Sequence, residues 1–338
     1  MLVLGIESTC DETAVAIVKD GREIISNVIS SQIDLHREFG GVVPELACRR
    51  HVDIMIPVLK ETLEKANLEL KDIDLIAVAR GPGLIGAILI GLNTAKALSF
   101  ALNKPFIGIN HIEAHLYAAI MSHEKPILFP AIGSVLSGGH TVIVLINELG
   151  SYQLIGQTVD DAVGEAFDKV AKILNLPYPG GPEIEALALK GNPKKYPFKS
   201  GVVKANPYNF SFSGLKTAVL YAVRGQNASV TDTPLPLELC QDVAASFQRA
   251  AFSGIVSKTL QAAKEYGCQE IIFGGGVTNN QLLRKLFNEA SQDVSYVWPA
   301  VGLSLDNAAM IAGLGYQKFI AGNKGDSLDL EALTSIPF

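Results

Sequence analysis

Two histidines spaced four residues apart are the sharpest candidates for chemistry in this sequence. They lie in the motif His111-Ile-Glu-Ala-His115, directly after Asn110, a residue type that commonly caps the start of a helix. A spacing of four places both imidazoles on one helical face, where they can bind a single metal ion. An isolated pair of this kind is more often structural. Its polar context, at the end of a predicted strand, favours a site here.

The same motif raises the alternative of a metalloprotease, which uses His-Glu-x-x-His. There the general-base glutamate directly follows the first histidine. Glu113 instead lies two residues after His111, a turn of about 200° around a helix, and so points away from the metal. The protease is therefore disfavoured. Two histidines still need a third ligand, and imidazole with carboxylate suits zinc or iron. Asp306, where the last predicted helix begins, is the candidate.

A cluster of acids follows the first predicted strand, in Glu7-Ser-Thr-Cys-Asp-Glu-Thr13. Carboxylates in such a loop can hold a metal, orient water or accept a proton. Glu7 or Glu12 alone fits an ordinary solvated hairpin. Together with Asp11, at the tip of an apolar strand, they favour a functional loop.

Two glycine-rich loops follow apolar segments, namely Ser137-Gly-Gly-His-Thr141 and Gly274-Gly-Gly-Val-Thr-Asn-Asn280. Glycines let backbone amides approach an anion closely, and the second loop leads into a predicted helix whose N-terminus favours phosphate. Each loop alone also fits a tight turn, but both within a repeated framework favour nucleotide binding. The sequence has no G-x-x-x-x-G-K-[ST] motif, which excludes a P-loop NTPase.

Two further segments carry acids and glycines. Residues 160–169 place acids at the start of a predicted helix, which the helix dipole alone explains except at Asp168, beyond the first turn. Residues 178–185 contain Gly180-Gly-Pro182, which can also simply end one helix and begin the next.

The helices and strands predicted around these residues form a repeat. Strands are predicted at 2–7, 13–20 and 23–30, and the same strand, polar loop, strand, turn, strand order recurs at 131–136, 141–147 and 152–159. Alternating elements follow each copy: helix 45–66, strand 73–79, helix 85–102, strand 105–109 and helix 111–121, then helices 161–174, 182–190, 213–224 and 238–266, strand 270–274, helix 279–290, strand 294–298 and helix 305–320. This order predicts an α/β, duplicated actin-like ATPase fold of the Hsp70 and sugar-kinase type. Its two lobes, 1–130 and 131–338, would surround a nucleotide cleft.

Bulk properties fit an enzyme of the cytoplasm. The 338 residues suit two lobes, and 48% hydrophobic with 18% charged residues argue against disorder. No apolar run approaches the roughly 18 residues of a membrane helix, and the acidic start is unlike a signal peptide. The four cysteines are isolated, which disfavours a zinc ribbon or a disulfide framework.

The charge is unevenly distributed in a chain of net charge −6. No acidic residue occurs between Glu185 and Asp232, where seven basic residues fall: Lys190, Lys194, Lys195, Lys199, Lys204, Lys216 and Arg224. Within this stretch, residues 190–211 are rich in Pro, Gly, Asn and Lys and predict an exposed basic insertion. Such a segment is either a solvated face or a surface for nucleic acid.

Together these motifs resemble the TsaD (Gcp/YgjD) family of tRNA N6-adenosine threonylcarbamoyltransferases. Ten blocks between residues 5 and 312 carry the resemblance: GIESTCDET, GGVVPELA, GPGLIGA, HIEAH, SGGHT, DDAVGEAFDK, YPGGP, FSFSGLKT, GGGVTNN and DNAAMIA. The CDET form of the first block, and a start that is unlike a transit peptide, resemble the bacterial type.

The resemblance implies transfer of a threonylcarbamoyl group from threonylcarbamoyl-AMP to the N6 amine of the adenosine 3′ of the anticodon, in tRNAs that read codons beginning with A. It also implies a TsaB-like paralogue and a TsaE-like ATPase as partners. One divalent metal ion, Fe²⁺ with Zn²⁺ as the alternative, would be held by His111, His115 and Asp306, and Asp11 and Glu12 are the predicted catalytic acids. The adenylate would be bound by Val135, Leu136, Ser137, Gly138, Gly139, Asp168, Gly181, Glu185 and Asn280.

Two positions depart from the family pattern. The third metal ligand lies in SLDNAAMIA, where the family commonly has CTDNGAMIA, and Asn279 replaces a usual alanine. Neither change removes a predicted ligand. Two other functions remain as alternatives: a small-molecule kinase of the same fold, and a non-catalytic scaffold paralogue of the TsaB kind. The histidine pair and the second glycine loop disfavour the scaffold, which needs neither.

Overall fold

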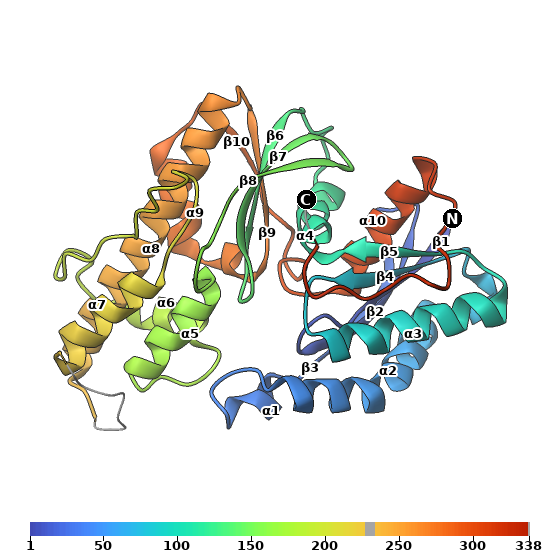
Figure 1. Cartoon of the computed structure of the whole chain (residues 1–338), viewed down its shortest axis with the longest axis horizontal. Helices are drawn as coiled ribbons and strands as arrows, with labels where there is room; N and C mark the ends of the chain where they lie inside the picture. The colour runs from blue at the N-terminus through green and yellow to red at the C-terminus, as the bar shows by residue number, and fades with distance from the viewer. Residues whose placement is uncertain (227–233, 337–338) are drawn as a thin grey trace. The chain divides into compact units, whose positions relative to one another are not determined.

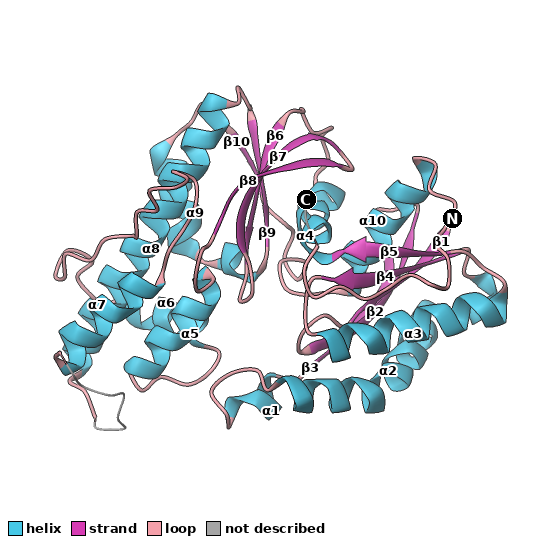
Figure 2. Ribbon diagram, in the orientation of Figure 1, coloured by secondary structure: helices cyan, strands magenta, loops and turns pink. Residues whose placement is uncertain are grey.

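The computed structural model describes residues 1–226 and 234–336 (Figure 1). Asp232, which ends the acid-free stretch, lies outside the described residues. The chain forms two compact units, one made of Met1–Lys125 with Pro299–Phe338 and the other of Pro126–Trp298. Each unit contains a five-stranded mixed sheet with helices packed against it (Figure 2).

The sheet of the first unit has the order β3-β2-β1-β4-β5. Its strands are β1 (Leu2–Glu7), β2 (Glu12–Lys19), β3 (Glu23–Ser31), β4 (Leu75–Gly81) and β5 (Phe106–Asn110). The hairpin strands β1, β2 and β3 pair antiparallel, whereas β4 and β5 run parallel to β1. Strands β1 and β4 are buried almost throughout, which is typical of parallel strands with both faces covered.

Helices cover this sheet on both faces. The helices of this unit are α1 (Ile33–Arg37), α2 (Pro44–Ala66), α3 (Ile85–Leu102), α4 (His111–Ser122) and α10 (Ala308–Ile320), with a short 3-10 helix at Leu70–Asp72. Of these, α2, α3, α4 and α10 pack against strands of the sheet. Because successive strand residues face opposite sides, Gly5 of β1 meets the start of α10 while its neighbour Ile6 lies towards α3. By length and composition alone α3 is apolar enough to cross a membrane, but it packs against β4 and α2.

The second unit repeats this topology with the order β10-β9-β6-β7-β8. Its strands are β6 (Ala131–Leu136), β7 (Thr141–Glu148), β8 (Ser151–Gln157), β9 (Glu270–Gly274) and β10 (Ser295–Val297), and its helices are α5 (Val163–Ile173), α6 (Gly180–Ala188), α7 (Ser213–Arg224), α8 (Leu237–Glu265) and α9 (Gln281–Ala290), with a 3-10 helix at Gly276–Asn279. Again three hairpin strands are followed by two parallel ones. The predicted duplicated actin-like fold is confirmed.

The expected domain limits differ from the structure at the C-terminus. The predicted lobe 131–338 included the last helix, whereas Pro299–Phe338 belongs to the first unit. The physical reason is the apolar face of α10, which packs against β1, β2, β4 and α4. The sequence also did not predict α1, a five-residue helix too short to show a period.

Candidate functional site

The site in the first unit begins at one edge of the sheet. Parallel strands end at a common edge, so Glu7 at the end of β1 and Asn110 at the end of β5 lie on the same side. The Asn110 side chain accepts a hydrogen bond from the backbone N–H of Ile112 at 2.9 Å and caps α4 as predicted. The helix therefore begins at His111, and His115 follows one turn later on the same face.

A close approach between β1 and α10 places the third predicted ligand. A side chain at Gly5 would put its Cβ 2.2 Å from the Ala308 carbonyl oxygen, so glycine is required for the helix start to lie against the strand. Asn307 caps α10 by accepting from the Met310 N–H at 3.0 Å. Asp306 therefore lies in the turn before the helix, and the helix start predicted at residue 305 was wrong by three residues because the cap is Asn307.

The three predicted metal ligands converge. His115 Nε2 lies 3.1 Å from His111 Nε2 and 3.1 Å from Asp306 Oδ1, and His111 Nε2 lies 3.6 Å from the same oxygen. Metal–nitrogen bonds of about 2.0–2.1 Å in a tetrahedral site separate ligands by roughly 3.3 Å. All three ligand atoms lie within 4.8 Å of one another. They therefore have the donor types and the spacing that one divalent cation needs.

Glu7 orients the first histidine. Its fully buried carboxylate accepts from His111 Nδ1–H at 2.9 Å and from the Thr9 backbone N–H at 2.6 Å. This leaves His111 Nε2 as the metal-facing atom, the carboxylate–histidine arrangement that fixes tautomer and ring orientation in metal sites. Burial lowers the pKa of His111, but Glu7 and Asp306 more than offset it and raise the pKa to about 9.

Replacing Glu7 by Gln is expected to weaken metal binding about 10- to 100-fold, because the neutral amide fixes the His111 tautomer less firmly. Metal affinity measured by competition with a chelator reports this directly. Glu113→Gln is the matched control. The Glu113 carboxylate lies on α4, as His111 does, but it pairs with Lys318 at 2.8 Å and not with a metal ligand. Equal affinities of Glu7→Gln and the wild type would show that Glu7 has no orienting role.

Metal affinity is also expected to depend on pH. A metal displaces the proton from His111, whose pKa of about 9 keeps it protonated in the metal-free protein at neutral pH. Affinity should therefore rise about tenfold per pH unit up to pH 9 for each proton released, and level off above it. Titrations between pH 6.5 and 9.5 test this, and an affinity that is flat over this range would contradict the assignment of His111 as a ligand.

The predicted catalytic acids lie beside the triad in the same unit. Burial, the Asp306 carboxylate and the Asp11 carboxylate raise the pKa of Glu12 to about 10. Glu12 also accepts a hydrogen bond from the Ser31 hydroxyl at 3.2 Å. The carboxylates of Asp11, Glu12 and Asp306 repel one another when all are ionised. They are stable together only if they share a proton or bind a cation. Burial and Asp11 raise the pKa of the Cys10 thiol well above its usual value, which makes it a poor nucleophile.

The geometry rejects the metalloprotease. Glu113 is held by Lys318 of α10 at 2.8 Å, whereas the protease mechanism needs this carboxylate at the metal.

In the second unit, the two glycine loops meet at the edge where β6 and β9 end. These strands pair in parallel up to Val135 and Gly274. Gly275 has a φ of +90°, and a Cβ there would lie 2.4 Å from the Leu136 carbonyl oxygen, so the second loop needs glycine to follow the first this closely. At Gly138 and Gly139, by contrast, an added Cβ meets nothing within 4 Å. The side of the backbone on which their side chains would lie is therefore open.

The remaining predicted substrate residues are linked through α6. Asp168 accepts from the Gly180 N–H at 2.7 Å, and Glu185 accepts from the Gln281 N–H at 2.7 Å. Asn280 caps α9, because its side chain accepts from the Leu282 and Leu283 amides at 3.0 and 3.2 Å. Gly181 again has open space where a side chain would be. Hydrogen bonds thus join the start of α6 to α5 and the start of α9 to the interior of α6.

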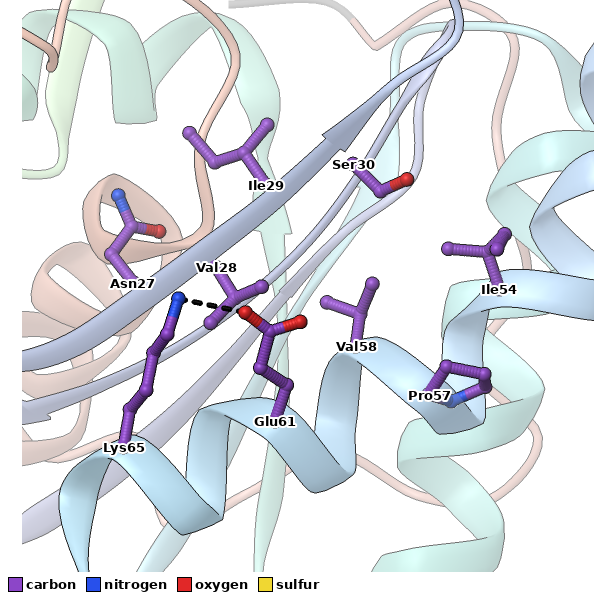
Figure 3. Close-up of a pocket in the computed structure, with 9 residues that line it drawn as sticks. All are labelled: Asn27, Val28, Ile29, Ser30, Ile54, Pro57, Val58, Glu61 and Lys65. Atoms are coloured by element: carbon purple, nitrogen blue, oxygen red, sulfur yellow. Dashed lines mark ion pairs between the residues drawn. The ribbon is translucent and has the colours of Figure 1, made fainter.

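A separate hollow of about 480 Å³ lies between β3 and α2, lined by residues 27–30 of the strand and by Ile54, Pro57, Val58, Glu61 and Lys65 of the helix (Figure 3). Lys65 and Glu61 pair with each other there at 2.7 Å. Among the described residues that line it there is no histidine or cysteine, and its one carboxylate, Glu61, is paired with Lys65.

Two contacts were not predicted from the sequence. The first is the contact of Glu7 with His111. The only sign of it in the sequence is an acidic residue at the end of a strand that is otherwise apolar. Lys216, counted among the basic residues of the acid-free stretch, pairs instead with Asp161 at 2.9 Å. Lys190, Lys194, Lys195, Lys199 and Lys204 are exposed.

Comparison with known proteins finds relatives that are similar to this chain in sequence and solved structures that are similar to it in fold. The sequence profile described as "TsaD: tRNA N6-adenosine threonylcarbamoyltransferase" matches residues 23–313. A relative with that enzyme name from Protochlamydia amoebophila is 67% identical, covering 100% of this chain and 98% of its own. The one from Bacillus subtilis is 49% identical over 96% and 92%. Among solved structures, T. kodakarensis HypF has a TM-score of 0.62 at 16% identity, covering 96% of this chain and 48% of its own, which supports the fold alone.

Proposed function

Because this chain belongs to the TsaD family of tRNA N6-adenosine threonylcarbamoyltransferases, we propose that it transfers a threonylcarbamoyl group from threonylcarbamoyl-AMP to tRNA. The acceptor is the N6 amine of the adenosine 3′ of the anticodon in tRNAs that read codons beginning with A. The products are threonylcarbamoyl-adenosine (t6A) and AMP. The observation that carries this proposal is the convergence of His111, His115 and Asp306 in a chain similar to that enzyme along its whole length.

We propose that these three residues hold one divalent metal ion, Fe²⁺ rather than Zn²⁺. Two histidines and one carboxylate form the ligand set typical of non-haem iron(II), although zinc accepts it too. Such an ion supplies Lewis acidity that polarises a carbonyl and neutralises negative charge. Glu7 keeps His111 Nε2 available for the ion, and metal analysis of the native protein distinguishes the two elements.

The adenylate part of the donor is assigned to the second unit. A mixed anhydride with AMP is an activated donor, which the weakly nucleophilic amine of adenine requires. The open backbone at Gly138, Gly139 and Gly181 leaves room for the adenylate. Backbone amides of such loops stabilise a departing phosphate. Val135, Leu136, Ser137, Asp168, Glu185 and Asn280 complete the proposed binding surface.

Asp11 and Glu12 are proposed to act on the acceptor amine. As the amine attacks the carbamoyl carbon it must lose a proton, and an ionised carboxylate can accept it. Glu12, whose pKa is about 10 in the metal-free protein, could do so only once a bound cation lowers that pKa. The acceptor adenine lies in the anticodon loop, which is largely single-stranded. Bringing this adenine into the site therefore costs less free energy than flipping a nucleobase out of a duplex.

The proposed setting is cytoplasmic, where free thiols persist, and all four cysteines are free. A TsaB-like paralogue and a TsaE-like ATPase are the proposed protein partners, on the basis of the family resemblance. The exposed basic insertion 190–211 is proposed to contact tRNA.

Incubation of the protein with threonylcarbamoyl-AMP, unmodified tRNA and these partners tests the proposal. One AMP should be released for each threonylcarbamoyl group that becomes attached to tRNA. The kinase alternative predicts a phosphorylated small molecule and ADP from ATP instead. The scaffold alternative predicts a protein that contains no metal.

A further inference from the structure

A second hollow lies in the second unit, between residues 193–200 and α8, and the proposed chemistry does not use it. Its volume is about 370 Å³, near the lower end of the roughly 300–1,000 Å³ of small-ligand sites. Its floor is one stripe of α8, because Ser246, Arg249, Ala250 and Ser253 recur at spacings of three and four residues. Its wall is the basic segment itself.

The wall is fixed against the helix without a ligand. The Tyr196 N–H donates to the Ser246 hydroxyl at 3.2 Å, and that hydroxyl donates to the Asn192 carbonyl at 3.2 Å. Further along, a side chain at Gly254 would put its Cβ 2.7 Å from the Ser200 Cβ, so the segment lies directly on the helix there. A hollow that exists before binding does not require its ligand to order the loop.

The lining combines an aromatic surface with unpaired positive charge. Tyr196 and Phe198 are half-buried, and their rings stack with centroids 5.5 Å apart and planes 10° apart. Lys194, Lys199 and Arg249 are exposed, and none has an ion pair with a described residue. Among the described lining residues there is no Asp or Glu.

These groups match what an unpaired nucleotide offers. Aromatic rings stack on bases of any sequence, and arginine and lysine bind phosphate. Duplex RNA hides its base faces, so an aromatic surface in a small hollow suits a single-stranded base. A free anion would use the cations but has no face to place on the two rings.

We propose that this hollow binds one unpaired nucleotide of the tRNA substrate, with its base against Tyr196 and Phe198 and its phosphate at Arg249 and the two lysines. The nucleotide is distinct from the reacting adenosine, because the hollow contains neither the metal ligands nor the acids Asp11 and Glu12. The inference rests on the proposed function, which supplies tRNA as the substrate.

The phosphate contact is tested with the full-length protein and its partners by measuring affinity for an unmodified tRNA transcript between 50 and 200 mM salt. Arg249→Glu is expected to weaken binding about tenfold or more, and to reduce the log–log salt slope by about 0.7, the value for one phosphate neutralised on a single strand. Lys264→Glu is the matched control, because Lys264 is also exposed on α8, outside the hollow, and the charge change is the same. The control should change affinity less than about twofold.

The base contact needs a variant that keeps the loop in place, since the two rings also help to anchor it. Ser253→Leu narrows the hollow from the exposed side of α8 and leaves both rings and all three cations intact. It is expected to weaken tRNA binding about tenfold with an unchanged salt slope, because stacking is prevented and no charge is removed. Ultraviolet cross-linking of the wild-type complex should yield tRNA adducts on the peptide that contains Tyr196 and Phe198.

The outcomes separate this inference from the proposed function. Loss of affinity in Arg249→Glu alone, without cross-links and with normal binding by Ser253→Leu, would show a phosphate contact and overturn the nucleotide site. Wild-type affinity in both variants would overturn it as well. If the wild-type protein modifies no tRNA with its partners, the proposed function fails. If it does so while both variants bind normally, only the hollow's role fails.

Discussion

Replacing His115 by Ala is expected to leave the protein without bound metal and to abolish transfer to tRNA. His115 is fully buried, and its Nε2 atom lies 3.1 Å from each of the other two ligand atoms. Removing it leaves two ligands, fewer than the three protein ligands of a catalytic zinc site or of the two-histidine, one-carboxylate iron site. Metal analysis should give about one ion per wild-type chain and close to none in the variant.

Thermal unfolding distinguishes loss of metal from loss of fold. A ligand present at 100 times its Kd stabilises the native state by about 2.7 kcal/mol, or roughly 4 °C in Tm for a chain of 338 residues. A chelator should lower the Tm of the wild type by that amount and leave the variant unchanged. His123→Ala is the control, because it removes an imidazole at the end of the same helix, outside the triad. Stoichiometric metal in His115→Ala would refute the site.

Substituting Asp11 by Asn or Glu12 by Gln is expected to lower turnover by about 10²–10⁴, the usual range for removal of a general base or acid. These amides keep the size of the side chains but cannot accept the amine proton. Both residues lie with Asp306 in the first unit, and the adenylate is assigned to loops of the second, so adenylate binding should remain near the wild-type level. Single-turnover rates and adenylate affinity measure the two effects separately.

A loss of adenylate affinity as large as the loss of rate would contradict a transition-state role for these acids. Metal content must be measured in parallel, because Glu12 is close enough to Asp306 for that carboxylate to raise its pKa. Normal turnover in both variants would direct the search for the proton acceptor to another group.

The architecture could be predicted from the sequence because local periodicity and the repeat pointed to the same fold. Both sheets have the strand order of the duplicated pattern, and the predicted helices and strands lie within a few residues of the observed ones. The return of Pro299–Phe338 to the first unit could not be predicted. Which sheet an apolar helix covers depends on tertiary packing, here the space that Gly5 leaves for α10.

The site was predictable to the extent that its residues lie in short motifs. The histidine spacing and the Asn110 cap lie within six consecutive residues, and the structure brings Asp306 to both histidines. The contact of Glu7 with His111 spans 104 residues, and no local pattern encodes it. The hollow beside α8 likewise requires a loop and a helix that are far apart in sequence.

Transfer to the adenosine 3′ of the anticodon is measured by nucleoside analysis of tRNA after incubation with the protein, threonylcarbamoyl-AMP and the partners. Two transcripts should be compared, identical except for adenosine or guanosine at the position 3′ of the anticodon. The proposed function predicts t6A in the adenosine transcript, no threonylcarbamoyl product in the guanosine transcript, and loss of the product when His115 is replaced by Ala. Absence of t6A from the first transcript, or equal modification of both, would contradict it.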